Sequence, residues 1–273
     1  STTSSEPSAP DPTTGTPTEP AGPCPAGMAL VEGGPVSKKQ RARWKKFYPE
    51  AEPPPPAEVS SFCLDLFEAT EADLAASADV IPVRPEMLPC HARGDCGDKP
   101  VEGLSRRESA QYCASRGKRV PTLVEWLWAA GGGTEDRKYP WGSSPPTAEH
   151  VNGCDDTCAR SRMSDCDDRD IKSGYCTVRN FSSVRGEDGY ENAAPVGSFP
   201  AGAGRWGHLD LAGNVAESVQ LGVGNDNFVC GGSYEGMHQG FDFSLHKRIC
   251  EIAGRTPQSV RCASEPRATG RPR

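Results

Sequence analysis

The chain has 273 residues, of which only 35% are apolar, and it contains 30 glycines and 26 prolines. This composition excludes long helices and wide sheets and favours one loop-rich domain. The formal net charge of -7 excludes a globally basic nucleic-acid-binding protein, so we expect no nucleic-acid partner.

Residues 1–23 consist mostly of Ser, Thr and Pro and contain no aromatic or basic side chain. Such a segment buries too little apolar surface to form a core, so we expect a disordered linker here. A domain should follow over residues 24–263, with a basic tail over 264–273. The linker suits a tether or stalk, and a removed signal or a lipid-bearing cysteine just upstream of Ser1 would fit it. A tail without a role fits it equally well.

The first part of the domain alternates between short apolar runs and a basic segment. Residues 28–36 are expected to form a short strand that closes on a Gly-Gly turn, and residues 62–67 alternate in the manner of a second strand. Between them, residues 38–46 carry six basic side chains around Trp44, and four prolines follow at 53–56. We interpret this segment as a solvated loop; the alternative is a contact with an anionic polymer, a lipid or a partner protein.

Two helices are predicted in the middle of the chain because each begins with a capping box. In the first, Ser105 is followed three residues later by Glu108, and Gly117 ends the helix. In the second, Thr122 is followed by Glu125, and Gly131 ends the helix.

The second half of the domain is predicted to be irregular. The stretch 152–180 is acidic and holds four cysteines, which indicates a loop cross-linked by disulfides. From Glu191 onward, short apolar pieces are punctuated by glycine and indicate strand or turn fragments. The sequence has no alternation of strands and helices and no internal repeat, so the expected fold class is α+β with much irregular structure.

The chain contains twelve cysteines, an even number that suits disulfide bonding in an oxidising compartment. We therefore expect a secreted, periplasmic or cell-surface protein. The alternative is a cytosolic zinc protein with Cys90, Cys96, Cys154 and Cys158 as ligands, but the usual paired C-x2-C knuckles are missing.

Several ordered segments resemble the formylglycine-generating enzyme family, also called sulfatase-modifying factors. They are PVEGLSRRESAQYCASRGKRVPTLVEWLWAA at 100–130, YPWG at 139–142, GEDGYENAAPVGSFP at 186–200, GHLDLAGNVAE at 207–217, GGSY at 231–234 and VRC at 260–262. This resemblance implies a disulfide-rich variant of the C-type-lectin-like fold with little regular secondary structure.

The resemblance also implies one disulfide. Cys113 and Cys262 match family positions that pair, which would tie the end of the domain to its first central helix. The four loop cysteines are expected to pair among themselves in one of three connectivities, which the sequence does not distinguish.

Structural calcium is a further implication of the resemblance. The positions that match a first site are Asn152, the Gly153 carbonyl, Asp188 and the Tyr190 carbonyl. A second site would use Asn214, backbone carbonyls near it and Glu217. Such oxygen ligands suit calcium, although Asp188 and Asn214 also fit ordinary turns next to glycine.

This chain lacks the two cysteines that bind copper in active members of the family. Active members hold copper with two cysteines just after the GGS[WY] motif, and these positions are Gly236 and Phe241 here. We therefore expect no copper and no catalytic residue. The alternative is a different metal centre built on His238 and His246, with Met237 and Cys250 as further candidate ligands.

These observations lead to three hypotheses about function. The first is a non-catalytic, disulfide-stabilised binding or accessory module that recognises a protein, peptide or glycan through its loops. The second is a metal-dependent, O2-using oxidoreductase with an altered metal site. The third is a structural component of an envelope or extracellular assembly.

Overall fold

A computed structural model of the chain combines short helices and short strands with long irregular connections. It describes residues 22–51, 53–84, 87, 97–163, 168–173, 177, 182–222, 228–235, 241, 243–254 and 257–267. The α+β class expected from the sequence is confirmed. In these ranges, no helix has both the length and the apolar character needed to cross a bilayer.

A three-stranded antiparallel sheet joins the two ends of the domain. Strand β4 (Phe62–Asp65) lies between β1 (Met28–Val31) and β9 (Ala263–Ser264). A disulfide between Cys24 and Cys63 fastens the chain before β1 to β4. The run predicted as one strand at 28–36 is divided, because β2 (Gly34–Pro35) pairs instead with β3 (Glu58–Val59).

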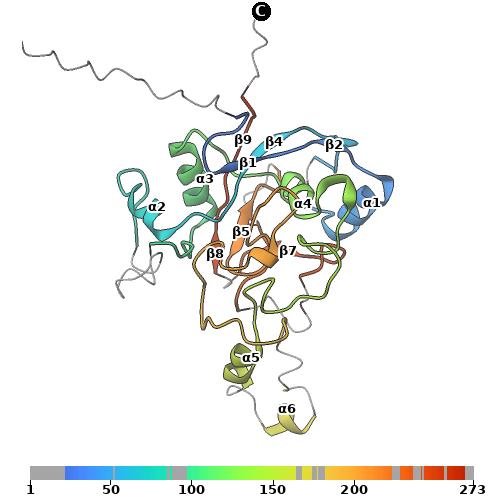
Figure 1. The fold of residues 1–273 in the computed structure, drawn as a ribbon, viewed down its shortest axis with the longest axis vertical. Coiled ribbons are helices and arrows are strands. Elements are labelled where there is room, and N and C mark those ends of the chain that lie inside the picture. Colours follow the sequence, from blue (N-terminus) through green and yellow to red (C-terminus); the bar gives the residue numbers. More distant parts are fainter. Residues whose placement is uncertain are drawn as a thin grey trace, which may run out of the picture.

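A four-stranded sheet occupies the centre of the view in Figure 1. Its order is β7 (Cys250–Ile252), β6 (Phe228–Cys230), β5 (Ala216–Val219) and β8 (Gln258–Ser259), and only the β5–β8 pair is parallel. Every residue of β5 and β6 is buried, so these two strands form part of the core. A disulfide links Cys230 to Cys250 across the β6–β7 pair.

Both predicted capping boxes are confirmed at the starts of α3 (Arg106–Ser115) and α4 (Leu123–Ala130). In α4, the side chains of Trp126 and Trp128 are almost fully buried. Their large apolar faces supply much of the main core, which includes residues from both sheets.

The basic segment at 38–46 is helical, so its prediction as a loop was wrong. Helix α1 (Lys38–Phe47) begins with a capping box formed by Ser37 and Gln40 and buries Trp44. Its two aromatic side chains, Trp44 and Phe47, pack toward the core, and six basic residues hid this pattern in the sequence. Packing of Trp44 against the core, together with the capping box, outweighs repulsion between like charges.

Three further helices are short. Helix α2 (Glu71–Ala75) follows β4, whereas α5 (Asp156–Met163) and α6 (Asp168–Lys172) fall in the acidic stretch predicted as a loop. The structure corrects that prediction for these two segments. In Figure 1, α5 and α6 lie at the end of the molecule opposite β1, β4 and β9.

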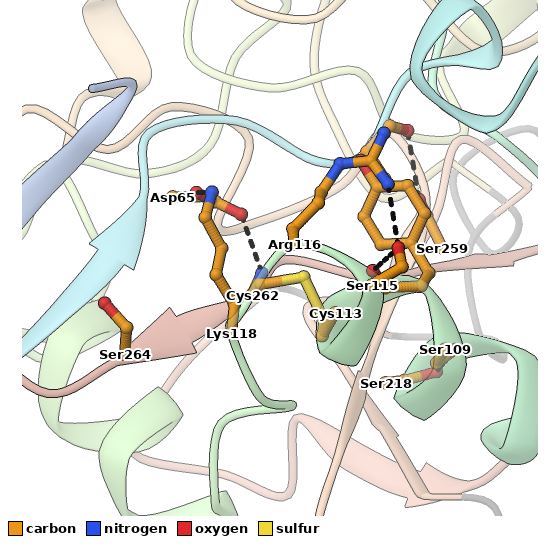
Figure 2. Close-up of a disulfide and its surroundings, with 12 residues drawn as sticks. Asp65, Ser109, Cys113, Ser115, Arg116, Lys118, Ser218, Ser259, Cys262 and Ser264 are labelled. Atoms are coloured by element: carbon orange, nitrogen blue, oxygen red, sulfur yellow. Dashed lines mark hydrogen bonds and ion pairs between the residues drawn. A yellow bond between two sulfur atoms is a disulfide. The ribbon is translucent and has the colours of Figure 1, made fainter. Parts of the chain in front are cut away.

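The disulfide implied by the resemblance, Cys113–Cys262, is present and ties α3 to the residue before β9 (Figure 2). Beside it, the Asp65 carboxylate accepts hydrogen bonds from Lys118 Nζ at 2.5 Å and from the Cys262 amide at 3.1 Å. Burial raises the pKa of Asp65, and the bond from Lys118 opposes this shift. One covalent link and one partly buried carboxylate therefore fix the C-terminal strand.

Candidate functional site

The GGSY turn follows β6 at a point where only glycine fits. Gly231 and Gly232 have φ values of 97° and 74°, and a Cβ on Gly232 would come within 2.5 Å of Phe241 Cε1. The Tyr234 amide then donates to the Asn214 carbonyl at 2.8 Å. The glycines therefore let the turn pass close to Phe241 and direct Tyr234 toward the loop that contains Asn214.

The buried side chain of Asn214 connects three segments that are distant in sequence. Its Oδ1 accepts from Asn152 Nδ2 at 3.2 Å and from the Ala194 amide at 2.9 Å. Its Nδ2 donates to Glu68 Oε2 at 2.9 Å. Asn214 adopts a left-handed φ of 53°, which Asn tolerates better than most residues. The Asn214 side chain therefore holds together the segments that contain Glu68, Asn152 and Ala194.

The fully buried guanidinium of Arg261 lies within an acidic cluster formed by Glu68, Asp210 and Glu217. Arg261 donates to both oxygens of Glu217, at 2.6 Å for the shortest contact, and Trp126 Nε1 donates to Glu217 Oε2 at 2.7 Å. Burial, together with the charges of Asp210 and Glu217, raises the pKa of Glu68 well above its ordinary value. Burial likewise raises the pKa of Asp210 to about 6.

Next to this scaffold lies an open cleft of about 510 Å³ whose walls come from α5, the 187–192 loop and the GGSY turn. Four carboxylates and two tyrosines line it: Asp155, Glu187, Glu191, Glu235, Tyr190 and Tyr234. The other lining residues are Thr157, Cys158, Gly189 and Asn192. Among the described residues, the lining carries no lysine or arginine, although Arg160 Nη1 lies 3.7 Å from Glu187 Oε1. The cleft is therefore suited to a cationic group.

Tyr234 connects the cleft to a carboxyl group with an unusual pKa. Its hydroxyl donates to Glu102 Oε2 at 3.3 Å. Burial raises the pKa of Glu102 to about 7; the Tyr234 hydrogen bond opposes the shift, and the charge of Glu235 adds to it. Burial also raises the pKa of Tyr234. Sequence reasoning missed this pair, because 132 residues separate Glu102 from Tyr234.

The first set of residues implied for calcium lies beside the cleft: Tyr190 lines it, and Asn152 Nδ2 donates at 3.1 Å to the carbonyl of Asn192, another lining residue. Asn152 Oδ1 and Asp188 Oδ2 are both buried and have no hydrogen-bond partner, whereas Asp188 Oδ1 accepts from the Tyr190 amide at 2.9 Å. A Cβ on Gly153 would come within 2.7 Å of Phe243 Cζ, so this position requires glycine. Burial and the nearby charge of Asp155 raise the pKa of Asp188 to about 6. Two buried oxygens without partners fit a hard cation.

The second implied set already has partners within the protein. The carboxylate of Glu217 accepts from Arg261 and Trp126, and the Oδ1 of Asn214 accepts from Asn152 and Ala194. These bonds occupy the side-chain oxygens that an ion would need.

Of the positions considered for copper or another metal, those that the structure describes supply no free thiolate. The buried ring of Phe241 packs edge-on against Phe243, with ring centroids 4.8 Å apart. Cys250 is oxidised in its disulfide with Cys230, and His246 Nε2 lies 2.9 Å from the Asp136 carbonyl. Gly236, Met237 and His238 lie outside the described residues. In the described ranges, no group of three or more His, Cys, Asp or Glu residues could hold a metal.

The cysteines in the described ranges that were candidates for zinc also have disulfide partners. Cys154 bonds to Cys158, which is one of the pairings expected within the acidic stretch. Cys90, Cys96, Cys166 and Cys176 lie outside the described residues.

Comparisons with known proteins agree with this architecture. Residues 14–266 match the family model described as sulfatase-modifying factor enzyme 1-like domain. The formylglycine-generating enzyme of Mus musculus is 32% identical over 119 residues, covering 43% of this chain and 26% of that protein. The inactive C-alpha-formylglycine-generating enzyme 2 of Mus musculus is 30% identical over 186 residues, covering 64% of this chain and 51% of that protein. The chain thus spans about a quarter to about half of the length of these relatives.

A solved structure shows the same fold. PvdO from Pseudomonas aeruginosa superposes with a TM-score of 0.54 at 17% sequence identity, covering 87% of this chain and 94% of that one.

Proposed function

The chain belongs to the sulfatase-modifying factor enzyme 1-like family, and from this premise we propose that it is a recognition domain without copper oxidase chemistry, whose acidic cleft binds a basic peptide segment of a partner. The observation that carries the proposal is the cleft of about 510 Å³, with four carboxylates and two tyrosines in its lining. Carboxylates pair with lysine or arginine, and tyrosine rings offer their faces to the same cations.

The lack of copper chemistry is supported by the residues at the copper positions. The resemblance aligns one copper-binding cysteine with Phe241, whose ring packs against Phe243 and the turn at Gly232. An apolar ring supplies no ligand atom, and an oxidised Cys250 supplies no thiolate.

Binding is tested by fluorescence anisotropy with a labelled peptide of alternating Arg and Gly, compared with a peptide in which citrulline replaces Arg. We expect the Arg peptide to bind and the uncharged citrulline peptide not to bind. The double variant Glu191→Gln, Glu235→Gln should weaken binding by about tenfold, because two carboxylates of the cleft are lost.

The matched control is Asp79→Asn, Glu149→Gln, which removes two exposed carboxylates outside the cleft. Its affinity should stay close to that of the unmodified chain. Equal binding of the citrulline peptide, or equal weakening by both double variants, would reject the cleft as the site.

Chemistry is tested by O2 consumption and product analysis with a sulfatase-type cysteine peptide in the presence of copper, together with metal analysis of the same sample. We expect no formylglycine and no stoichiometric copper or iron. Formylglycine would overturn the proposal. Bound copper or iron that disappears in His238→Ala, His246→Ala would instead favour an oxidoreductase with an altered metal site.

We also propose that the first calcium set has a structural role. A bound ion would supply a positive charge that joins Asn152 to the loop containing Asp188, which forms one wall of the cleft. Calcium should raise the thermal midpoint of the chain, and Asp188→Asn should abolish this increase, whereas Asp79→Asn should retain it. An equal calcium response in both variants would argue against this set.

Finally, we propose an oxidising location, such as the cell surface or a secreted form. The support is the presence of four disulfides within the described ranges. Cell fractionation with thiol trapping tests it: free thiols throughout the native protein would contradict the location.

A further inference from the structure

The exposed face of α1 carries positive charge on a rigid support. Gln40 Nε2 donates to the Gly133 carbonyl at 2.9 Å, Trp44 is 4% exposed, and Arg43 forms an ion pair with Asp136. These contacts use one face of the helix and fix its position. The opposite face contains Lys38, Arg41, Ala42 and Lys45, which recur at helical spacing.

The charges on this face are not balanced by the protein itself. Within the part of the chain that the structure describes, Lys38, Arg41 and Lys45 form no ion pair, and Arg41 Nε is buried without a hydrogen-bond partner. The chain as a whole carries a net charge of -7, so this local concentration of cations is an exception to its overall charge. The exposed cationic ends of Lys38 and Lys45 therefore remain available to an external anion.

The face is also hollowed. Lys38, Arg41, Ala42 and Lys45 form one wall of a hollow of about 340 Å³, and the exposed Pro54 and half-buried Pro55 form the other. The proline rings, the Ala42 methyl group and the aliphatic stems of the basic side chains make its lining mostly apolar. An apolar side chain can therefore enter the hollow while neighbouring anionic groups meet the cationic ends.

From this arrangement we propose that the hollow between α1 and Pro54–Pro55 is a docking site for an acidic, extended peptide segment of a partner protein. Along the helix axis, Lys38 and Arg41 are about 4.5 Å apart, and Arg41 and Lys45 about 6 Å apart. In an extended peptide, side chains on the same face recur about every 6.6 Å. Two or three alternating carboxylates can thus pair with the three cations, and an apolar residue between them contacts the prolines.

Other anionic partners match the site less well. A bilayer presents a broad flat surface, whereas the cations line a hollow. A nucleic acid would bring a dense row of phosphates against a protein with a net charge of -7, and only this short basic face would attract it. A short acidic segment needs only the local patch.

The test uses the full chain and a labelled peptide of alternating Glu and Val, with a Gln–Val peptide as the uncharged counterpart. We expect the Glu–Val peptide to bind, added salt to weaken the complex, and the Gln–Val peptide not to bind. Lys38→Glu, Lys45→Glu reverses two charges in the hollow and should reduce affinity by about tenfold or more.

The matched control is Lys39→Glu, Lys46→Glu. It makes the same charge change at the same seven-residue spacing on the same helix, at exposed positions outside the hollow. Its affinity should fall by no more than about threefold, through long-range charge alone. Circular dichroism and thermal midpoints establish that both variants fold.

Should Lys38→Glu, Lys45→Glu fail to fold, Ala42→Glu places a carboxylate at the wall of the hollow and should abolish binding in the same way. Equal weakening by both double variants would overturn the proposal, as would equal binding of the Gln–Val peptide or no binding of the Glu–Val peptide. Tighter binding of oligothymidylate or of phosphatidylserine vesicles, lost in Lys38→Glu, Lys45→Glu, would also overturn it and identify the other class of partner. The cleft variants do not touch this site, so the two proposals can fail separately.

Discussion

At the scale of single residues, the buried side chain of Arg261 compensates the acidic cluster. It forms hydrogen bonds with Glu217 and with the carbonyls of Asp65 and Leu209. Coulombic attraction to Glu217 and Glu68 raises its pKa, although burial opposes this. A guanidinium with several acceptors is one of the few charged groups that a protein interior tolerates.

Replacing Arg261 with Met should be strongly destabilising, because it leaves Glu217 buried without a cation. We expect the free energy of unfolding to fall by about 3–5 kcal/mol in urea titrations at neutral pH. The double variant Arg261→Met, Glu217→Gln should lose less than the sum of the two single losses. Strictly additive losses would show that the pair is not coupled.

Glu102 should make stability depend on pH. Its pKa in the folded protein, about 7, lies above the ordinary value of 4.5, so the folded state binds more protons than the unfolded state between these pH values. Its contribution therefore favours folding at low pH and is lost as pH rises from about 4.5 to about 7.

We expect Glu102→Gln to be close to the unmodified chain in stability near pH 4.5 and relatively more stable near pH 8. Urea titrations across this range measure the difference. A constant difference between the two proteins at all pH values would contradict the raised pKa. His208 contributes in the opposite direction, since burial lowers its pKa to about 3, but both proteins share it.

At the scale of elements, short sequence motifs predicted the helices whose starts depend on contacts between neighbouring residues. The capping boxes of α3 and α4 were readable because both partners lie three residues apart in sequence. Helix α1 has the same type of box with Gln40 at the third position, but its six basic side chains led to the prediction of a solvated loop. Its helical state depends on a partner at Gly133, which is 93 residues away and which sequence patterns do not show.

Gln40→Ala should destabilise the chain through α1. The change removes the buried hydrogen bond to the Gly133 carbonyl and the acceptor for the Ser37 amide. We expect a loss of about 1–2 kcal/mol in the free energy of unfolding. Lys39→Ala, at the exposed neighbouring position, should change stability by less than about 0.5 kcal/mol, and equal effects would show that Gln40 is not an anchor.

The candidate site was only partly predictable from the sequence, because its residues come from segments that are far apart in the chain. The residues of the first calcium set were named through their resemblance to a family, since Asn152 and Asp188 stand far apart in sequence. Each carries a buried side-chain oxygen without a hydrogen-bond partner, and this burial depends on tertiary packing that sequence patterns do not show. The Tyr234–Glu102 pair had no sequence signal, because neither residue has an unusual local context.

At the scale of the whole molecule, disulfides replace part of the apolar core that a loop-rich chain lacks. The bond between Cys113 and Cys262 spans 149 positions, whereas that between Cys230 and Cys250 spans 20. In the chain-entropy account, a longer closed segment restricts the unfolded state more. The sequence indicated disulfides, and family resemblance was needed to choose this partner.

Removing the long-range disulfide should therefore cost more than removing the short-range one. We expect Cys113→Ala, Cys262→Ala to lose about 5 kcal/mol and Cys230→Ala, Cys250→Ala about 3 kcal/mol in the free energy of unfolding. Denaturant titrations of the two double variants under oxidising conditions give the comparison. A larger loss in the second variant would mean that local packing outweighs chain entropy.

The two ends of the domain meet beside the sheet of β1, β4 and β9, which affects how the domain can be joined to another chain. The Arg267 amide donates to the Pro23 carbonyl at 2.7 Å, so the polypeptide enters and leaves the folded unit at one place. A unit with adjacent entry and exit can be spliced into a surface loop of a host protein, or circularly permuted, with little distortion. Helix α5, which lines the acidic cleft, lies at the opposite end in Figure 1. A host joined through either end would therefore hold the cleft facing outward.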